Sequence, residues 1–573
     1  MCPPTLPYNP YEIFHGAHCN IPPRHIVTSR RVHSHMPADF ISALPLADQV
    51  AAHILRAQAS RIGERVFVTC GTQKISYREA DQRAGRVAAA LHALGLSKGD
   101  RVGILLRNCV EYLDLWFGLS RIGAIQLPLN TAYKSPQLLH SLSRAPVAAV
   151  VTEDALLAEL TPVIDRIPTI KTLVLIGDTR PKVKCKSLFF NDFLLSAQNE
   201  PPALKVTGAD IGAIMNTSGT TGPSKGVQLS HAQQYILGRN IARDMALTEN
   251  DVYYNCFPLF HNTAQAMITM PVLLAGARMV LVERFSATRF WPDMHEHGCT
   301  AFYYIGETLR ILLKSTTAQD GAGSQLRIGW GIGASAADFL EFQTRHKVAM
   351  RTGYGSTEGN VGVYLPHDNP ILASVGRALP GFEVRIADEN NDPLPPGKAG
   401  EILVRASEPC TVMLGYDGDA AATIAAWKDL WFHTGDAGYL DAEGNLFFKG
   451  RVKDGIRVRG ENVSAFEIEE TIAQVNGVLE VAAIAVPCEL GGDDIKIVVV
   501  ARADSGLKAE TLIAHADKHL PKFAVPRYVE FLAALPKTET NKIRKNVLRE
   551  TPFTPSTWDR LNSHHQNKKE HYV

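Results

Sequence analysis

Residues 214–231 read IMNTSGTTGPSKGVQLSH, and this stretch decides how the rest of the chain is interpreted. The apolar residues 211–215 predict a buried strand that runs into three glycines interleaved with threonine, serine and Lys225. Glycines let the backbone turn its N–H groups towards one point, hydroxyls add donors, and the lysine adds a positive charge. The combination suits the oxygens of a polyphosphate, although such clusters also form ordinary surface turns. It is not the Walker A pattern, because Lys225 follows Ser224 and precedes Gly226.

The bulk composition is that of an ordinary globular protein. A chain of 573 residues is too long for one core, so two or more domains are expected. Lys and Arg total 59 against 58 acidic residues, which gives no reason to expect a nucleic-acid or membrane surface. No apolar run approaches the roughly 20 residues that span a bilayer. The nine cysteines are scattered and include no Cys-x-x-Cys pair, which favours reduced thiols in a cytoplasmic protein over a disulfide framework. The same spacing argues against a structural zinc site.

The first 35 residues differ from the rest, because they are rich in proline, histidine and arginine and contain one acidic residue, Glu12. They predict a flexible N-terminal arm or an over-extended start. From Leu44 onward a helical pattern and short apolar runs alternate, which predicts a layered α/β fold with largely parallel sheets. The expected helices cover 80–96 and 110–122, and the expected strands cover 66–70, 74–77, 101–106, 125–129, 147–152 and 172–176.

Two later regions have their own patterns. Short runs punctuated by Pro and Gly between residues 375 and 448 predict a β-rich subdomain. From residue 466 to about 548 the pattern restarts as helix, strand, strand, helix, strand, which predicts a small α+β domain of roughly a hundred residues. The final segment, 551–573, is polar and predicts a solvated tail.

Three motifs allow both a functional and an ordinary interpretation. His261 follows an expected strand at 252–258 and could gate a pocket, although a lone histidine is more often simply packed. His295, His297 and Cys299 suggest a metal site only weakly, because residues two apart on a helix point to different faces. Residues 326–336 read LRIGWGIGASA, and a strand followed by Gly-x-Gly-x-x-Ala resembles a dinucleotide-binding turn. This leaves an NAD-dependent oxidoreductase open as an alternative.

Four further motifs follow the polyphosphate stretch: YGSTEG at 354–359, WFHTGD at 431–436, GRVKDGIRVRGEN at 450–462 and PKTETNK at 536–542. In wording and order, the five motifs together resemble the adenylate-forming superfamily of acyl-CoA synthetases, adenylation domains and luciferases. The resemblance spans roughly residues 44–548. The wording of residues 257–286, and from 375 to the end, resembles the carnitine/crotonobetaine-CoA ligase group of small-acid CoA ligases.

The resemblance implies a site for ATP and Mg²⁺. The implied contacts of the β- and γ-phosphates are Thr217, Ser218, Gly219, Thr220, Thr221, Gly222 and Lys225. Thr357 and Glu358 are implied at the α-phosphate, and Glu358 and Thr221 at the metal. Adenine would lie between Tyr354 and the strand end at Gly333 and Ala334, and Gly355 and Ser356 are further nucleotide-binding residues. Asp436 is implied for the ribose hydroxyls and Arg451 for the ribose–phosphate side. On this view the Gly-x-Gly-x-x-Ala turn at 331–336 forms one side of the adenine pocket and does not bind a dinucleotide.

It also implies the groups that carry the chemistry, namely Lys542, Glu358, Thr221 and His261. Lys542 matches the lysine that bridges the acid's carboxylate and the α-phosphate, and His261 matches a position between acyl pocket and thiol tunnel. Gly460 lies where the pantetheine arm of coenzyme A passes, and Lys453 matches a hinge. The acid's walls are predicted to include Phe257, Phe260, Tyr303 and Tyr304. Asn541 stands where the family usually has glycine, and asparagine tolerates a left-handed backbone.

The implied architecture is a large AMP-binding domain over 36–450, with its β-rich subdomain at about 375–450, a hinge at 451–453 and a mobile C-terminal domain over 454–550. The implied activity is an ATP- and Mg²⁺-dependent acid–CoA ligase, which forms an acyl-adenylate, releases pyrophosphate and then makes a CoA thioester. The expected partners are a small carboxylic acid and coenzyme A, with no nucleic acid and no membrane span; a homodimer stays open. The alternatives are transfer of the acyl group to a carrier protein or an amine, and a non-catalytic binding module, which the retained charged residues disfavour.

Overall fold

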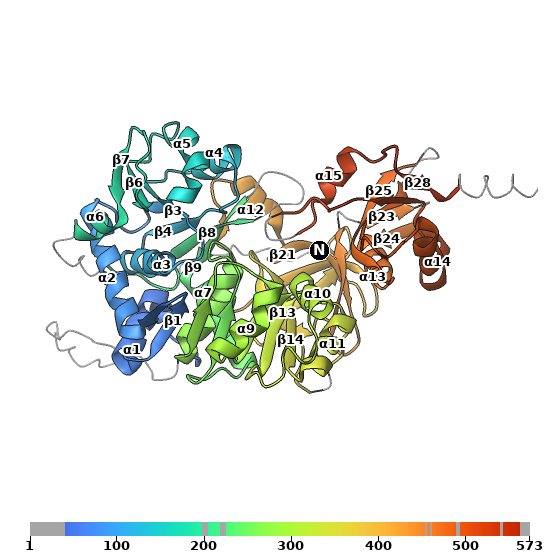
Figure 1. The fold of residues 1–573 in the computed structure, drawn as a ribbon, viewed down its shortest axis with the longest axis horizontal. Helices are drawn as coiled ribbons and strands as arrows, with labels where there is room; N and C mark the ends of the chain where they lie inside the picture. Colours follow the sequence, from blue (N-terminus) through green and yellow to red (C-terminus); the bar gives the residue numbers. More distant parts are fainter. Residues whose placement is uncertain are drawn as a thin grey trace, which may run out of the picture. The chain divides into compact units, whose positions relative to one another are not determined.

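A computed structural model describes residues 40–196, 204–217, 225–368, 370–452, 455–458, 461–488, 493–538 and 542–561. The predicted arm at 1–35, Ser218 to Gly222 of the polyphosphate stretch, Lys453, Gly460 and Asn541 lie outside the described residues. Two large sheets and a smaller one are joined to a separate C-terminal sheet, whose elements are drawn in orange and red (Figure 1). The predicted α/β class with layered, largely parallel sheets is confirmed.

The first large sheet has eight strands and contains the polyphosphate stretch. In spatial order they are β19 (Gly415–Tyr416), β9 (Lys225–Ser230), β8 (Ile211–Thr217), β4 (Ile125–Pro128), β3 (Arg101–Leu105), β5 (Ala149–Glu153), β6 (Thr172–Ile176) and β7 (Lys186–Phe189). From β8 to β7 all neighbours run parallel, and β9 and β19 are added antiparallel. The helices in this part of the chain are α1 (Ala51–Ile62), α2 (Tyr77–Ala93), α3 (Val110–Ile122), α4 (Ser135–Ser143), α5 (Leu157–Ile164) and α6 (Phe190–Leu195).

The second large sheet has nine strands. In spatial order they are β16 (Arg377–Ala378), β15 (Asn360–Tyr364), β14 (Ala349–Ser356), β13 (Ile328–Ile332), β12 (Ala301–Ile305), β10 (Val252–Asn255), β11 (Arg278–Leu281), β1 (Val66–Cys70) and β2 (Gln73–Ser76). Strands β14 to β1 run parallel. The helices that belong to it are α7 (His231–Asp244), α8 (Met270–Ala275), α9 (Ala287–His297), α10 (Gly306–Ser315) and α11 (Ala336–His346).

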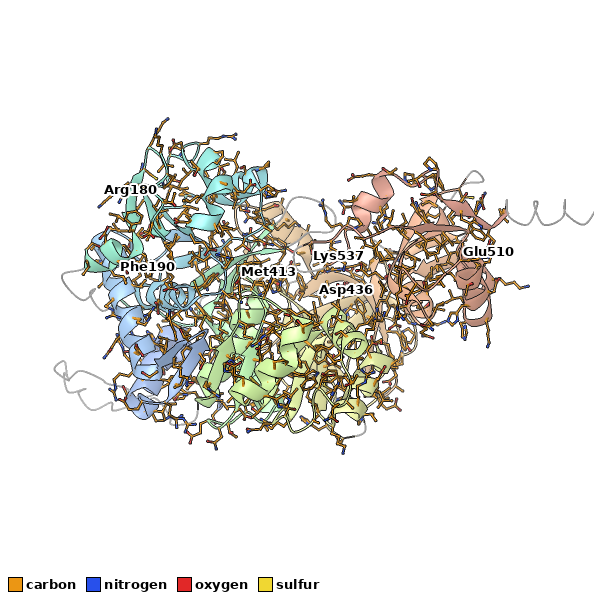
Figure 2. All side chains as sticks on the ribbon, viewed as in Figure 1. Arg180, Phe190, Met413, Asp436, Glu510 and Lys537 are labelled. Atoms are coloured by element: carbon orange, nitrogen blue, oxygen red, sulfur yellow. The ribbon has the colours of Figure 1, made fainter. Side chains whose placement is uncertain are left out.

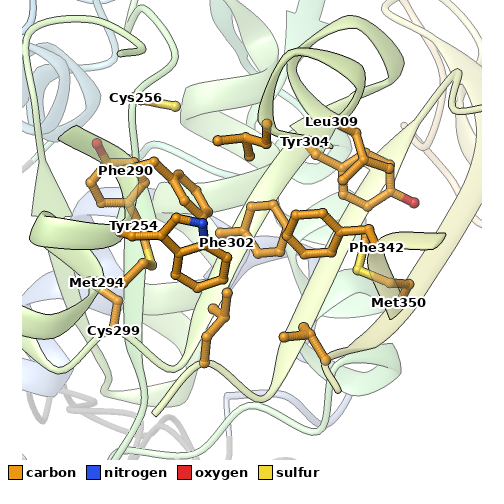
Figure 3. Close-up of a cluster of buried hydrophobic side chains, with 14 of the residues drawn as sticks. Tyr254, Cys256, Phe290, Met294, Cys299, Phe302, Tyr304, Leu309, Phe342 and Met350 are labelled. Carbon is orange, nitrogen blue, oxygen red and sulfur yellow. The ribbon is translucent and has the colours of Figure 1, made fainter. Parts of the chain in front are cut away.

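An aromatic cluster packs helices α9 and α11 onto this second sheet (Figure 3). Phe302 of β12 contacts Phe290 of α9 edge-on, with ring centroids 5.4 Å apart, and Phe342 of α11 at 5.5 Å. Aromatic pairs of this kind add about 0.5–1.5 kcal/mol beyond the area that they bury. This packing holds the sheet rigid, so its strand ends can present polar groups in a fixed arrangement.

The remaining sheets are largely antiparallel. The five-stranded sheet consists of β17 (Phe382–Ala387), β18 (Gly400–Ala406), β21 (Trp431–Leu440), β20 (Trp427–Lys428) and β22 (Leu446–Arg451), and helix α12 (Ala420–Ala426) precedes β20. The C-terminal sheet consists of β25 (Val478–Pro487), β26 (Asp493–Ala501), β27 (Tyr528–Phe531) and β28 (Trp558–Asp559). Its neighbours are the hairpin β23 (Gly455–Val458) and β24 (Glu461–Ser464) and helices α13 (Ala465–Ala473), α14 (Ala509–His519) and α15 (Lys545–Glu550). The predicted order helix, strand, strand, helix, strand after residue 466 is confirmed.

The predicted elements at the start of the chain are correct except at their boundaries. The structure has α3 at the predicted residues, but α2 begins at Tyr77 and not at residue 80. The reason is a capping box, in which the Ser76 side chain accepts a hydrogen bond from the backbone N–H of Glu79, and the Glu79 carboxylate accepts one from Ser76. The pattern Ser-x-x-Glu was therefore a readable start signal, and Tyr77 belongs to the helix rather than to the preceding strand.

Among the described residues, no helix combines the length and the apolar character needed to cross a bilayer. Within the same residues there is no group of three or more His, Cys, Asp or Glu side chains placed to bind a metal ion.

We predict that the folding stability of the protein depends on pH through His231, the first residue of helix α7. Its side chain is 2% exposed, and neither ring nitrogen has a partner among the described residues. Burial lowers the pKa of His231 to about 4. The unfolded chain, with a histidine pKa near 6.5, therefore binds more protons between about pH 4 and 6.5, so folding is destabilised as the pH falls through that window. We expect His231 to account for a loss of up to about 3 kcal/mol there.

The measurement is the melting temperature of wild type and His231→Leu between about pH 5 and 7. The variant should lose part of the wild type's decline at acidic pH, while His92→Gln, which changes an exposed histidine of α2, should keep it. Identical pH dependence in wild type and His231→Leu would contradict the prediction.

Candidate active site

Asp436 lies at the centre of the candidate site, on β21 and directly opposite Arg451 of β22 (labelled in Figure 2). Its carboxylate accepts a hydrogen bond from the Tyr354 hydroxyl at 2.7 Å and pairs with Arg451 Nε at 3.0 Å. The residue is 6% exposed. Burial raises the pKa of Asp436, while Arg451 and the tyrosine hydroxyl oppose the rise. A carboxylate offers about four acceptor positions, so the two bonds seen here leave room for two more from a ligand.

The backbone around Asp436 is fixed by hydrogen bonds of its own. Gly435 has a φ of +69°, a conformation that glycine adopts without strain. Its N–H donates to Glu401 Oε1 at 3.0 Å, and the other Glu401 oxygen lies 2.9 Å from His433 Nδ1. The N–H of Asp436 donates to Thr434 Oγ1 at 3.0 Å. The carboxylate is thus presented by a rigid turn before any ligand arrives.

Tyr354 and Gly333 lie at the carboxyl ends of neighbouring parallel strands, β14 and β13. Such strand ends are where ligands bind in open α/β sheets. Gly333 has a φ of +73°, and a Cβ added there would meet no atom within 4 Å, so the space beside it is open. At Gly355 a Cβ would lie 2.1 Å from the carbonyl oxygen of Asn360, so only glycine fits. Ala334, the other predicted adenine contact, follows Gly333, and Ser356, predicted to bind the nucleotide, is the last residue of β14.

Glu358 and Lys225 lie on either side of Tyr416. The Tyr416 hydroxyl donates to Glu358 Oε1 at 3.3 Å, and Lys225 Nζ stands 4.5 Å from the centre of its ring. The contact arises because β19, which carries Tyr416, pairs with β9, which begins at Lys225. Thr217 ends β8 opposite Lys225, and the carbonyl of Thr357 accepts from Gln233 Nε2 at 2.9 Å. One tyrosine therefore holds the phosphate-side lysine and the predicted metal-side carboxylate together.

Lys542 enters this region from the C-terminal part of the chain. Its backbone carbonyl accepts the N–H of Thr538 at 2.7 Å, and its own N–H donates to Thr538 Oγ1 at 3.0 Å. Lys542 is exposed to solvent, but the protein around its ammonium partly desolvates it, and this desolvation together with Arg451 lowers the pKa of Lys542. Glu358 and Asp436 act in the opposite direction. The structure thus places Lys542 within electrostatic reach of three residues that the sequence assigns to the nucleotide.

His261 follows β10 and precedes the π-helical turn Thr263–Thr269. Burial and Lys542 lower the pKa of His261 to about 4, so the ring is neutral at neutral pH. Its Nδ1 accepts the N–H of Thr263 at 3.2 Å and lies 2.9 Å from the Thr263 hydroxyl. Because Nδ1 accepts, the ring proton is assigned to Nε2, which leaves a hydrogen-bond donor facing away from Thr263.

The predicted walls of the acid pocket need one correction. On β12, Tyr303 contacts Phe257 edge-on, with centroids 5.2 Å apart, and stacks on Trp330 at 5.9 Å. Tyr304 instead belongs to the buried aromatic cluster, and its hydroxyl donates to the carbonyl of Arg351 at 2.8 Å. Successive side chains of a strand point to opposite faces, so the prediction was wrong for Tyr304.

Two contacts were not predicted from the sequence. Tyr416 appears in no motif quoted above, and Glu401, which holds the turn before Asp436, lies 35 positions earlier in the chain. The sequence Gly415-Tyr416-Asp417-Gly418, a tyrosine and an acid between two glycines, was the available signal for the first. The second depends on the pairing of β18 with β21, which the local sequence does not specify.

Comparisons with known proteins identify the family of the chain. The AMP-binding enzyme family matches residues 55–417, and the AMP-binding enzyme C-terminal domain matches residues 467–542. The crotonobetaine/carnitine–CoA ligase of Salmonella paratyphi A is 31% identical over 499 residues, covering 84% of this chain and 95% of the relative.

Two solved structures are similar over most of the chain. ATP-bound MatB from Rhodopseudomonas palustris is 28% identical with a TM-score of 0.77, covering 87% of this chain and 98% of that one. The anthranilate CoA ligase AuaEII, solved with anthranoyl-AMP, has a TM-score of 0.81 at 24% identity, covers 89% of this chain and 98% of its own, and shows the shared fold. The chain belongs to the AMP-binding enzyme family, among the adenylate-forming acid–CoA ligases.

Proposed function

We propose that this chain activates a small carboxylic acid as an acyl-adenylate, with Lys542 and His261 at the reacting groups, and then transfers the acyl group to coenzyme A. The observation that carries the proposal is that Lys542 lies within electrostatic reach of Asp436, Arg451, Glu358 and His261. These residues come from segments up to 281 positions apart in the chain, from His261 to Lys542. A purely structural role would not require two cations and two carboxylates in one small region, whereas binding a nucleotide and a carboxylic acid does.

The nucleotide is proposed to bind with its adenine between Tyr354 and the Gly333 strand end, where the structure leaves open space. The two vacant acceptor positions of Asp436 would receive the ribose hydroxyls, and Arg451 would lie on the phosphate side. The triphosphate would follow β8 towards Lys225. In this assignment the cations Lys225 and Arg451 face phosphate oxygens, and the carboxylate of Asp436 accepts hydrogen bonds from hydroxyl groups.

The donor set also fits Mg²⁺. Glu358 supplies a carboxylate, the hard oxygen ligand that this ion prefers together with phosphate oxygens, and the Tyr416 hydroxyl orients one of its two oxygens. When bound, Mg²⁺ neutralises charge on the phosphate oxygens. Thr221, the other predicted ligand, lies outside the described residues.

Adenylation brings a carboxylate against a triphosphate, so negative charge approaches negative charge. The ammonium of Lys542 is proposed to lie between the acid's carboxylate and the α-phosphate, where it offsets the charge that builds up as pyrophosphate leaves. His261, as a neutral Nε2–H donor, would hydrogen-bond the carboxylate without adding a second cation. The acyl-adenylate hydrolyses readily, so its shielding from water is part of the C-terminal segment's role.

Thioester formation needs the Lys542 position vacated for the thiol. We propose the large domain and the hinge given by the sequence, with rotation about residues 451–453 carrying the C-terminal domain away after adenylation. That domain extends past the predicted end at residue 550, because β28 pairs with β27 in its sheet. The acid is proposed to be small, with Phe257 and Tyr303 on one side of its pocket. The Salmonella relative is named for crotonobetaine and carnitine, and AuaEII for anthranilate, so both a quaternary-ammonium acid and an aromatic acid belong in a substrate panel.

The test is pyrophosphate release with ATP, Mg²⁺ and a panel of short aliphatic, aromatic and quaternary-ammonium acids, with and without coenzyme A. We expect release that depends on one class of acid, and thioester only when coenzyme A is present. Release without consumption of coenzyme A would point to a carrier protein or an amine as acceptor. No release with any acid would overturn the proposal.

A further inference from the structure

The segment that carries Lys542 is anchored at its base by a second lysine, Lys537 (labelled in Figure 2). Lys537 Nζ lies 2.6 Å from Glu307 Oε1 and 3.0 Å from Glu480 Oε1. Glu307 is in the first turn of α10, and Glu480 is on β25 of the C-terminal sheet. One ammonium is thus shared by two carboxylates that are 173 positions apart in the chain.

Lys537 and Lys542 are rigidly connected. Lys537 forms an antiparallel bridge with Ile543, and the N–H of Arg544 donates to the carbonyl of Pro536 at 2.7 Å. With the Thr538–Lys542 bonds described above, these contacts make residues 536–538 and 542–544 the two arms of a hairpin. A displacement of Lys537 therefore displaces Lys542 with it.

The anchor sets one ammonium against two carboxylates, and Lys314 adds a second positive charge within reach of Glu480. Burial lowers the pKa of Lys537, but its hydrogen bonds to Glu307 and Glu480 outweigh that effect and raise it overall, so the ammonium stays protonated. The side chains are 20%, 28% and 31% exposed, so water screens the pair less than at an open surface. Glu480 Oε2 is buried and has no hydrogen-bond partner among the described residues, so the carboxylate depends on Lys537, its ion-pair partner, with Lys314 adding a weaker attraction.

The far end of α10 contacts the same side of the C-terminal sheet. Lys314 Nζ donates to the carbonyl of Val478 at 2.9 Å. Between this contact and the Lys537 anchor lies a cavity of about 520 Å³, lined by Glu307, Lys314, Glu480 and Lys537 among others. Because this interface is hollow rather than close-packed, polar contacts carry a large share of its specificity.

From this arrangement we infer that Lys537, through Glu307, is a positioning residue that locks Lys542 in place for the adenylation step only. The inference rests on the proposed function. Glu307 belongs to the large domain and Glu480 to the C-terminal domain, so a rotation about residues 451–453 breaks the first pair and keeps the second. The Lys537–Glu307 pair therefore stabilises one domain orientation and contributes nothing to the other.

The experiment measures the two half-reactions separately in the full-length protein, with an acid identified by the pyrophosphate assay. ATP–pyrophosphate exchange reports adenylation, and thioester formation from added acyl-adenylate reports the second step. We expect Glu307→Gln and Lys537→Met to lower the exchange rate roughly tenfold, the effect of losing one hydrogen bond to a charged group, with thioester formation unchanged or faster. Lys537→Arg should restore most of the exchange rate.

Glu480→Gln is the matched control, because it changes the partner that moves together with Lys537. It should change the rates of both half-reactions by the same factor or leave both rates unchanged. Equal losses in both half-reactions for Glu307→Gln, or no loss in either, would overturn the inference. Absence of exchange in the wild type with every acid would instead overturn the proposed function.

Discussion

Replacing Lys542 by alanine is expected to slow acyl-adenylate formation by about 10²–10³-fold, the loss seen when one preorganised electrostatic donor is removed from a transition state. The physical reason is that Lys542 lies within electrostatic reach of Glu358 and Asp436, the residues between which the α-phosphate of ATP is proposed to bind. The surroundings of Lys542 lower its pKa, and an anion bound beside the ammonium would stabilise the charged form. Thioester formation from added acyl-adenylate should stay within a factor of about three, because the thiol attacks after Lys542 has left.

The measurement is ATP–pyrophosphate exchange beside single-turnover thioester formation. Lys518→Ala is the control, because it removes a lysine of α14 in the same part of the chain without touching the site. Loss of the thioester step together with exchange would mean that Lys542 supports the fold rather than the adenylation chemistry. An unchanged exchange rate would remove Lys542 from the mechanism.

The sequence predicts most of the nucleotide side of the site because its motifs lie at strand ends. Tyr354 lies near the carboxyl end of β14 and Gly333 directly follows β13, and because these strands pair in parallel both residues reach the same edge of the sheet. The contact between Asp436 and Arg451 could not be predicted from their separation in the sequence alone. They face each other because β21 and β22 form a hairpin with an irregular register between Ala437 and Gly438. A one-residue change of register would have turned one side chain away.

What the sequence could not predict are contacts between segments without a shared local pattern. Glu307 and Lys537 are 230 positions apart, and neither helix propensity nor spacing indicates that they meet. Tyr304 is a different case, because strict alternation along β12 already separates it from Tyr303. That error came from assigning neighbouring aromatic residues to one wall, and the period of a strand was enough to avoid it.

Asp436→Asn is expected to raise the KM for ATP about 10²-fold or more, since hydrogen bonds to a charged group contribute about 1.5–3 kcal/mol each. The carboxylate is buried and already accepts from Tyr354 and faces Arg451, which leaves its other acceptor positions for the ribose. Asparagine has one acceptor oxygen, and its amide would present donors to Arg451 or to the ribose hydroxyls. Tyr354→Phe is the matched control, because it removes one bond to Asp436 and keeps the charge; its effect should be below about tenfold.

Nucleotides that lack one ribose hydroxyl separate this contact from a loss of folding. With wild type, 2′-deoxy-ATP and 3′-deoxy-ATP should each bind more weakly than ATP. With Asp436→Asn that penalty should largely disappear, because the partner of the missing hydroxyl is already gone, and the two changes are then non-additive. Melting temperatures with and without ATP check that the variant is folded. Full additivity, with the deoxy penalty unchanged in Asp436→Asn, would show that the ribose hydroxyls bind elsewhere and that Asp436 serves only to hold Arg451 and Tyr354 in place.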